Sequence, residues 1–418
     1  MNRILTALLM LGGAPSFAPA QDTALTRLLL ETRRVLRIDN GRLAGPGGRM
    51  LVEEGLGSRF FLVGEEHGVA EIPEVVQALL SDLRPGGYNT LAIEVSPLQG
   101  RRLDSMARRP GVVAALDTLL SSWFTSIPFY TLASERKLLA SAMSAQGSTP
   151  PMRIWGLDYE VSGDRYYLQE LERLAPPAAQ PAVRRARQLA DSGFALFRTG
   201  NPSRLFAWTA PDSVFQDLRK ALGSEAPARA GEILDVLERT ARINRLFLRG
   251  RGYESNLDRS AWLRQNFIRA LGVAEREGPA PRVLLKFGGS HVMRGWNYTH
   301  TLDVGTAAAV LAEAHGERSY HVLMVGGPGT KNTRMNITKA QYEPIGTAEI
   351  DGTSLAWLRP ALPETGWVVF DLRAVRLAYL TRRSQTLTPV QDRFLHAYDA
   401  VVVLAGSTPG SANPLQVR

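Results

Sequence analysis

The fold is decided by the stretch Ser58–Gly68, which reads SRFFLVGEEHG. Its residues 59–63 are mostly apolar, as is typical of a buried strand. The run ends at a glycine, and two glutamates and a histidine follow directly. Apolar residues then recur at helical spacing over residues 72–83. The stretch therefore predicts a strand, a tight turn that carries ionisable groups, and a helix.

The ionisable residues of this turn are Glu65, Glu66 and His67. In open α/β sheets the ligand crevice lies beyond the carboxyl ends of the strands, which is where this turn is expected. Three adjacent ionisable groups are costly to bury, so their presence indicates a function. The alternative is a capped turn that holds one structural histidine. Similar groups at other strand ends favour the functional interpretation.

Three other predicted strands are also followed by chemical groups. These are Glu94 at the end of strand 89–95, Asp158 after strand 152–157, and His291 after strand 282–287. Further strands are predicted at residues 320–325, 367–372 and 400–404. Alternating strands and helices imply parallel neighbours, whose carboxyl ends open on one edge of the sheet. We therefore predict an α/β fold, with a mostly parallel sheet flanked by helices and one site built from several strand ends.

Both histidines of this group occur in the pattern Gly-x-x-His directly after a strand. The copies are GEEH, which ends at His67, and GGSH, which ends at His291. Glycine lets the backbone turn tightly and lets a substrate or ion approach closely. The repetition at equivalent places indicates that the two histidines belong to one site.

The composition is that of an ordinary globular protein. The chain has 418 residues, of which 44% are hydrophobic and 21% charged, enough to build a large core. The formal net charge of +9 would suit acidic partners, but we favour the explanation that a GC-rich codon bias enriches arginine. No aromatic-basic stripe or nucleic-acid motif accompanies the charge, so we expect no nucleic-acid partner.

The first 20 residues predict a signal peptide. Arg3 precedes an apolar run, and the small residues Ala18 and Ala20 form a cleavage site before Gln21. The apolar run is too short to span a bilayer, so we expect no transmembrane anchor. The sequence contains no cysteine, which excludes disulfides and a lipidated cysteine. We expect a periplasmic or secreted protein whose mature domain covers residues 21–418.

The middle of the chain, residues 162–271, is mostly helical in pattern and rich in alanine and arginine. We interpret it as a helical subdomain that is inserted into the sheet domain and acts as a cap. Crossover helices packed on the sheet would have the same composition. Elsewhere the pattern predicts helices at 21–36, at 132–144 and directly after Ser96, a loop at 41–48, and an irregular segment at 329–356.

Several short motifs resemble one group of proteins. They are GEEHG at 64–68, AIE at 92–94, IWGLDYE at 154–160 and GGSHV at 288–292. They look like motifs of the erythromycin-esterase-like, ChaN-like and TraB/Tiki superfamily, whose members share an α/β core with paired histidine turns. The segment RSAWLRQN, with Arg259 and Asn266, is similar to a helix of erythromycin esterases. The resemblance covers about residues 60–310. GEEH has one residue between its first glutamate and its histidine, which is nearer the ChaN-like and Tiki spacing than that of erythromycin esterases.

The resemblance implies a hydrolase that cleaves a small-molecule ester or lactone with activated water. It implies that His67 is the general base, oriented by Glu65 or Glu94. It further implies that His291 and Arg259 polarise the carbonyl or hold the developing oxyanion. Histidine titrates near neutral pH and a neighbouring carboxylate raises its basicity, which is consistent with these roles. The sequence has no Gly-x-Ser-x-Gly motif, so a serine nucleophile of the ordinary α/β-hydrolase kind is not expected.

Two alternatives stay open. His67, His291 and Glu65 could hold a divalent ion such as Zn²⁺ or Mn²⁺ with an open water position, as in a Tiki-like metallopeptidase. ChaN-like relatives are associated with haem, and the two histidines could ligate its iron. The other histidines have no partner motif and are predicted to be structural or exposed: His300, His315, His321 and His396.

Overall fold

The computed structural model describes residues 23–123, 127–145, 150–201, 204–224, 226–336, 341–352, 354–381 and 387–412. The predicted signal peptide, residues 1–20, and the predicted mature terminus at Gln21 lie outside the described residues.

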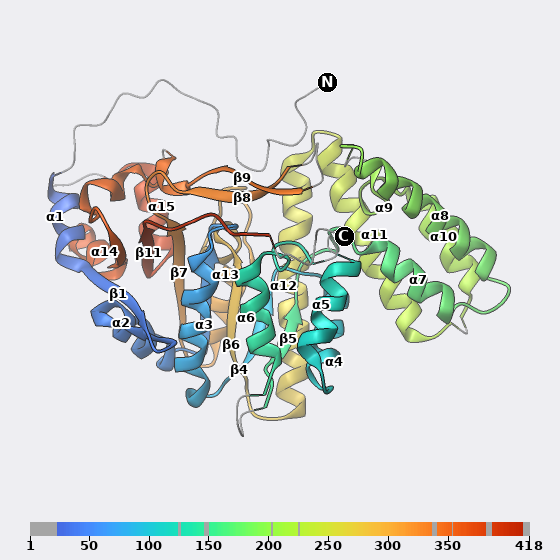
Figure 1. Ribbon diagram of the computed structural model, residues 1–418, viewed down its shortest axis with the longest axis horizontal. Helices are drawn as coiled ribbons and strands as arrows, with labels where there is room; N and C mark the ends of the chain where they lie inside the picture. Colours follow the sequence, from blue (N-terminus) through green and yellow to red (C-terminus); the bar gives the residue numbers. More distant parts are fainter. Residues whose placement is uncertain are drawn as a thin grey trace.

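A nine-stranded sheet forms the centre of the molecule, in the order β2-β1-β10-β11-β7-β3-β6-β4-β5 (Figure 1). Every neighbouring pair from β11 to β5 is parallel, and β2, β1 and β10 complete the other side in antiparallel pairs. The strands are β1 (Arg33–Asp39), β2 (Arg42–Ala44), β3 (Phe60–Glu65), β4 (Tyr88–Ile93), β5 (Arg153–Gly156), β6 (Arg282–Gly288), β7 (Ser319–Gly326), β10 (Gly366–Asp371) and β11 (Ala400–Ala405). The predicted α/β class with a mostly parallel sheet is confirmed, as are all the predicted strands.

Helices cover both faces of this sheet. One face is covered by α2 (Gly45–Leu56), α3 (Glu71–Leu83), α4 (Pro97–Ala107), α5 (Val112–Ser122) and α6 (Ala133–Met143). The other face is covered by α1 (Thr23–Thr32), α12 (Gly252–Glu277), α13 (Val304–Ala314), α14 (Leu372–Thr381) and α15 (Pro389–Ala397). Successive β3 side chains enter the two cores alternately, which explains why the strand is apolar throughout.

The helices on the right of Figure 1 have a core of their own. They are α7 (Asp164–Leu174), α8 (Gln180–Phe197), α9 (Phe206–Thr209), α10 (Asp212–Leu222) and α11 (Ala228–Leu248). The next helix, α12, is 26 residues long and joins the two parts, because Leu263, Phe267 and Leu271 pack on the sheet while Trp262 packs on the separate core. The helical region therefore contains both a separate cluster and a helix that packs on the sheet.

Three local predictions are wrong. The helix predicted at residues 21–36 ends at Thr32, because the next residues pair as β1 with β10. The predicted loop at 41–48 contains β2 and the start of α2. The irregular segment contains an antiparallel hairpin of β8 (Lys331–Asn336) and β9 (Gln341–Thr347), which lies across the top of the sheet in Figure 1. In each case contacts with distant parts of the chain override the local pattern.

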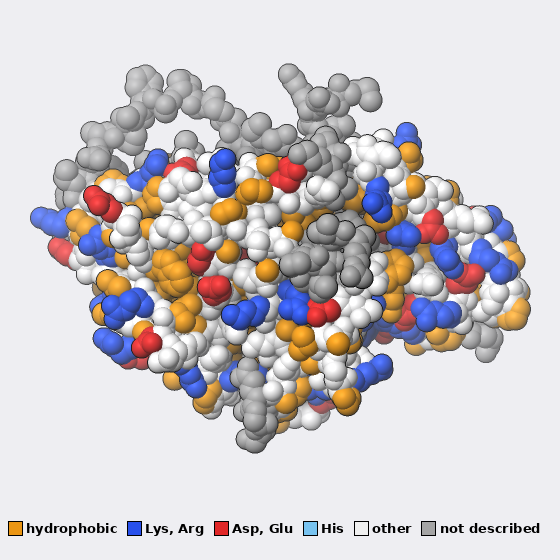
Figure 2. Space-filling model, in the orientation of Figure 1, with side chains coloured by type: hydrophobic (Ala, Val, Ile, Leu, Met, Phe, Trp, Pro, Cys, Tyr) orange, Lys and Arg blue, Asp and Glu red, His pale blue; other side chains and the backbone are white. Residues whose placement is uncertain are grey.

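On the face seen in Figure 2, basic side chains are interspersed with acidic and apolar ones rather than gathered in one stripe. Across the described ranges, no helix has both the length and the apolar content that a bilayer crossing requires. The absence of a nucleic-acid partner remains a prediction.

Candidate active site

The turn that carries His67 is fixed by two glycines. At Gly64 an added Cβ would lie 2.6 Å from Cγ2 of Val292, on the segment after β6. Gly68 has a φ of +82°, and an added Cβ there would lie 2.1 Å from the carbonyl oxygen of Thr333 on β8. Both positions therefore exclude larger residues, and the turn stays tight at the carboxyl end of β3.

The His67 imidazole is held on both of its nitrogens. Nδ1 lies 3.0 Å from Oε1 of Glu65, and Nε2 lies 3.4 Å from Oε2 of Glu94. The ring of Phe129 is stacked on the imidazole, with centroids 3.9 Å apart and planes 4° apart. The His67 side chain is 26% exposed.

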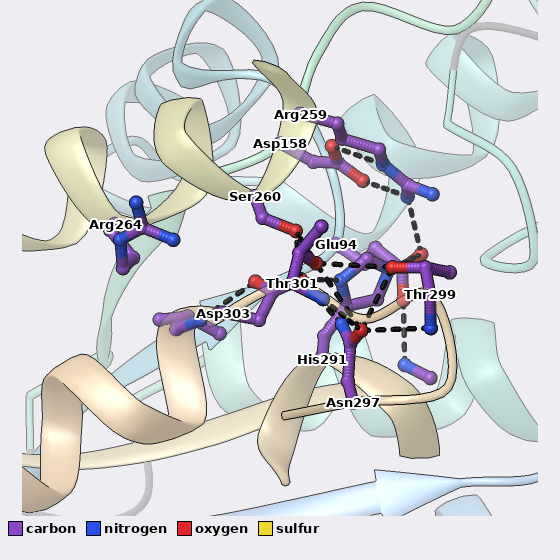
Figure 3. Close-up of polar contacts among 12 residues, drawn as sticks. Glu94, Asp158, Arg259, Ser260, Arg264, His291, Asn297, Thr299, Thr301 and Asp303 are labelled. Atoms are coloured by element: carbon purple, nitrogen blue, oxygen red, sulfur yellow. Dashed lines mark hydrogen bonds and ion pairs between the residues drawn. The ribbon is translucent and has the colours of Figure 1, made fainter. Parts of the chain in front are cut away.

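His291 is held in the same way, at the other oxygen of Glu94. Figure 3 shows it among Glu94, Asp303 and their partners. It lies on a short 3-10 helix, η3 (Gly289–Val292), directly after β6. Its Nδ1 lies 2.9 Å from Oδ2 of Asp303, and its Nε2 lies 3.6 Å from Oε1 of Glu94. Asp303 also accepts a hydrogen bond from Ser260 and is fully buried. Each histidine therefore has its own carboxylate at Nδ1, and the two share one carboxylate at Nε2.

Glu94 is the centre of the arrangement. Besides the two imidazoles, it accepts a 2.6 Å hydrogen bond from the backbone nitrogen of Gly288 and pairs with Arg259 at 2.9 Å. The following helix is capped by Ser96, as predicted, so Glu94 is not needed to start it. A Cβ at position 288 would lie 2.8 Å from Nε2 of His67, so glycine permits this close packing.

Arg259 comes from α12 and lies over the ring of Tyr159. It pairs with Asp158, with its Nε 2.9 Å from Oδ1, as well as with Glu94. Asn266, one α12 position of the esterase-like motif, donates to the carbonyl oxygen of Leu157. The structure thus brings all five predicted catalytic residues into one contiguous network: Glu65, His67, Glu94, Arg259 and His291.

These contacts place protons on the histidines. Burial alone would lower the pKa of His67, but Glu94 and Glu65 raise this pKa to about 10. At His291 burial also lowers the pKa, but Asp303 and Glu94 outweigh burial, so this pKa is raised as well. Glu94 has a pKa well below its usual value, because the two imidazoles and Arg259 outweigh the effect of its burial. At neutral pH the resting site therefore contains a protonated His67 beside an ionised Glu94.

Glu66 belongs to the same turn but does not face the histidines. Its carboxylate accepts hydrogen bonds from the backbone nitrogens of Gly326 and Glu349 and from the side chain of Asn332. It therefore ties the end of β3 to β7 and to the β8–β9 hairpin. These contacts give Glu66 a structural role in the turn.

The predicted metal ligands do not converge on one point. Glu65 uses one oxygen for Nδ1 of His67 and the other for Lys286, so it cannot join the Nε2 atoms around an ion. Across the described ranges, no group of three or more His, Cys, Asp or Glu residues is arranged to hold a metal ion. The two Nε2 atoms both face the Glu94 carboxylate, one at each oxygen. The three predicted metal donors are therefore not brought together in this structure.

Four residues of the site were not predicted as such: Asp303, Lys286, Glu135 and Phe129. Lys286 could have been found from the sequence, because it interrupts the apolar run that follows Arg282 in the strand RVLLKF. Asp303 had a weaker one, because it stands directly before a helix as its N-cap. Among the other histidines, His321 is buried, while His300, His315 and His396 are exposed, as predicted.

Phe129 has a φ of +69°, a left-handed conformation that is strained for a bulky residue. Strain of this kind costs about 1–3 kcal/mol and is concentrated at functional sites. We predict that Phe129→Gly is more stable than Phe129→Ala by about 1 kcal/mol, although glycine is usually the less stable of the two. Urea denaturation of the two variants measures the difference in their free energies of unfolding. Both variants lack the ring contact with His67, so its loss does not affect this difference. An alanine variant of equal or greater stability would contradict the prediction.

Comparisons with known proteins agree with the fold. No protein-family model matches the sequence, and no curated protein sequence shows a significant match to it. Among solved structures, a protein from Bacillus cereus has a TM-score of 0.60 at 14% identity, covering 94% of this chain and 100% of its own. A mutant of erythromycin esterase EreC in its open conformation has a TM-score of 0.58 at 15% identity. The match covers 92% of this chain and 99% of the esterase chain.

A succinoglycan biosynthesis protein has a TM-score of 0.56 at 12% identity, covering 95% of this chain and all of its own. These identities are low, so the similarity concerns the fold. The match extends over nearly the whole length of each protein. The chain therefore has the erythromycin-esterase-like fold.

Proposed function

We propose that this protein is an exported hydrolase that cleaves a small-molecule ester or lactone with water. The observation that carries the proposal is the pair of imidazoles whose Nε2 atoms face one buried carboxylate at the carboxyl edge of the sheet. Each imidazole is oriented by a further carboxylate at Nδ1, from Glu65 or Asp303. The shared fold with an erythromycin esterase supports the same reaction class.

In the proposed reaction the neutral form of His67 is the general base. Its Nδ1 proton is donated to Glu65, which leaves the Nε2 lone pair to accept a proton from water. The water oxygen bonds to the acyl carbon, and the carbonyl oxygen takes up the negative charge. When the carbonyl re-forms, the bond between the acyl carbon and the leaving oxygen breaks, and the imidazolium gives its proton to that oxygen. The products are the acid and the alcohol, and His67 is neutral again.

Positive charge for the oxyanion comes from His291 and Arg259. Asp303 and Glu94 raise the pKa of His291 and so favour its charged form, and Arg259 is permanently charged. Both are fixed by carboxylates before substrate binds, so little reorganisation accompanies the reaction. Such preorganised charge is usually the largest single contribution to catalysis. Glu94 balances these cations in the resting enzyme.

The proposal is tested on purified protein with a panel of ester and lactone substrates, with and without a chelator. We expect acid release from at least one substrate at a rate that the chelator does not change. A rate that the chelator abolishes and Zn²⁺ or Mn²⁺ restores would instead support a metallopeptidase-like mechanism. A Soret band in the purified protein, without hydrolysis, would support haem binding.

Export is proposed from the sequence of the first 20 residues. We predict that the mature chain begins at Gln21, because Ala18-Pro19-Ala20 follows a short apolar run. Intact mass spectrometry of the protein recovered from the periplasm or medium should show this terminus. A chain recovered from the cytoplasm with Met1 retained would contradict the prediction.

A further inference from the structure

Lys286 forms a buried ionic contact next to the proposed active site. Its ammonium nitrogen lies 2.6 Å from Oε2 of Glu65 and 2.8 Å from Oε1 of Glu135. The lysine side chain is 1% exposed, and the two carboxylates are 4% and 3% exposed. The nitrogen also lies 5.5 Å from the centre of the Tyr130 ring. The contact is thus shielded from water on every side that the structure describes.

The strand register explains how these groups meet. Lys286 on β6 is paired with Val63 on β3. Side chains alternate between the faces of a sheet, so Glu65 points to the same face as Val63, two residues further along the strand. Helix α6 packs on that face and supplies Glu135 in its first turn. Three distant segments therefore place one ammonium between two carboxylates.

Stability alone does not account for this contact. Removing charges from water is costly, and apolar residues of similar volume often replace a buried ion pair with no loss of stability. The ionic contact does, however, reach the catalytic histidine. Glu65 has two oxygens: Lys286 binds one of them, and the other lies 3.0 Å from Nδ1 of His67.

We propose that Lys286 is a positioning residue for the hydrolysis, acting through Glu65 on His67, and that Glu135 holds its ammonium in place. The ammonium fixes the rotation of the Glu65 carboxylate and keeps it ionised. Glu65 then accepts from His67 through its other oxygen, so the proton of neutral His67 is fixed at Nδ1 and the lone pair lies on Nε2, on the Glu94 side of the ring. The kinetic part of this inference rests on the proposed function, whereas the effect on the His67 proton does not.

The other groups around His67 cannot replace this effect. Glu94 faces Nε2 rather than Nδ1, and Phe129 contacts only the face of the ring. Glu135 and Glu349 act on His67 electrostatically, but no hydrogen bond joins either of them to the imidazole among the described contacts. The second oxygen of Glu135 has no hydrogen-bond partner in the described structure, so its contact with Lys286 is its main polar interaction.

The test is the double variant Lys286→Met/Glu135→Leu, compared with Arg136→Met/Asp117→Leu. The first double variant removes one positive and one negative charge and keeps an apolar filling, so folding is expected to survive. The second also removes one charge of each sign, from an ion pair between α6 and α5 that is partly exposed, and it leaves Lys286 in place, so it serves as the matched control. Two quantities are measured: kcat and KM for ester hydrolysis, and the proton NMR signal of the hydrogen-bonded Nδ1–H of His67, assigned by its absence in His67→Ala.

We expect the double variant to lose about 10- to 100-fold in kcat with little change in KM, the size of effect that misplacement of a catalytic group produces. We also expect its Nδ1–H signal to disappear or broaden, while the control keeps both rate and signal. A double variant with the wild-type kcat and signal would overturn the inference. So would a control that loses as much as the double variant, since the ammonium is still present there.

If the wild-type protein hydrolyses no substrate, the proposed function fails and the NMR signal alone decides the inference. A signal retained in the double variant then overturns it, and a lost signal supports it. If the double variant does not fold, Lys286→Gln takes its place, because it is neutral but keeps a donor for Glu65. We expect a smaller loss of kcat and a weakened signal, because the charge that keeps Glu65 ionised is gone while a donor remains, and wild-type values would overturn the inference.

Discussion

His67→Ala lowers kcat/KM for ester or lactone hydrolysis by about 10²-fold or more. This is the typical contribution of a positioned acid–base group, and no other imidazole in the described structure is bound to Glu65. The side chain is partly exposed and its backbone turn is fixed by Gly64 and Gly68, so the variant is expected to fold. Steady-state kinetics with a substrate identified in the panel gives the ratio.

A useful control for this variant is His396→Ala. His396 is exposed on α15 and pairs only with Asp392 among the described residues, so its loss should leave kcat/KM unchanged. Wild-type activity in His67→Ala would remove this residue from the mechanism. Equal losses in both variants would point to a general effect on the preparation rather than to the site.

His291→Ala is the second variant with a large expected effect, about 10²-fold in kcat/KM, because it removes a preorganised cation from the oxyanion side. His67 and His291 both face Glu94, so the two variants should not be independent. We expect the double variant His67→Ala/His291→Ala to lose much less than the product of the single losses, as residues that act as a unit do.

The double-mutant cycle is measured from the four kcat/KM values under one set of conditions. Circular dichroism and thermal unfolding of each protein show whether the fold is retained. Losses that multiply would mean that the histidines act in separate steps or separate sites, which would contradict a single site around Glu94.

The sequence alone predicts much of this site, because its chemistry lies at strand ends. Glu65, His67, Glu94 and His291 each follow a recognisable buried run, and parallel strands bring such ends to one edge. Arg259 could be placed only through the resemblance to a helix of erythromycin esterases. It reaches the strand ends because α12 packs across the sheet, and no local pattern shows that.

The parts that escaped prediction depend on distant partners. Residues 33–36 continue the apolar period of α1, yet they form a strand because β10, near the other end of the chain, offers backbone hydrogen bonds. Glu135 looks like an ordinary acidic residue in the first turn of a helix. Its role depends on Lys286, which comes from a strand much later in the sequence. Charge pairs of this kind carry no periodic signal.

The raised pKa of His67 has opposite consequences for stability and activity. Burial lowers this pKa, but Glu94 and Glu65 raise it to about 10, above the value of 6.5 expected in the unfolded chain. The stabilising effect is therefore fully present below pH 6.5 and is lost as the pH rises through about 10. The basic form needed for catalysis appears over the same range. Stability should fall while the rate rises.

The central claim, that neutral His67 activates water, is tested most directly by titrating this residue and the reaction together. The imidazole of His67 is followed by NMR between pH 6 and 11, and kcat/KM is measured over the same range. We predict that kcat/KM rises with pH along a curve whose pKa matches the NMR value, and that both lie well above 6.5. A rate that is constant while His67 loses its proton, or that falls as it does so, would contradict the account.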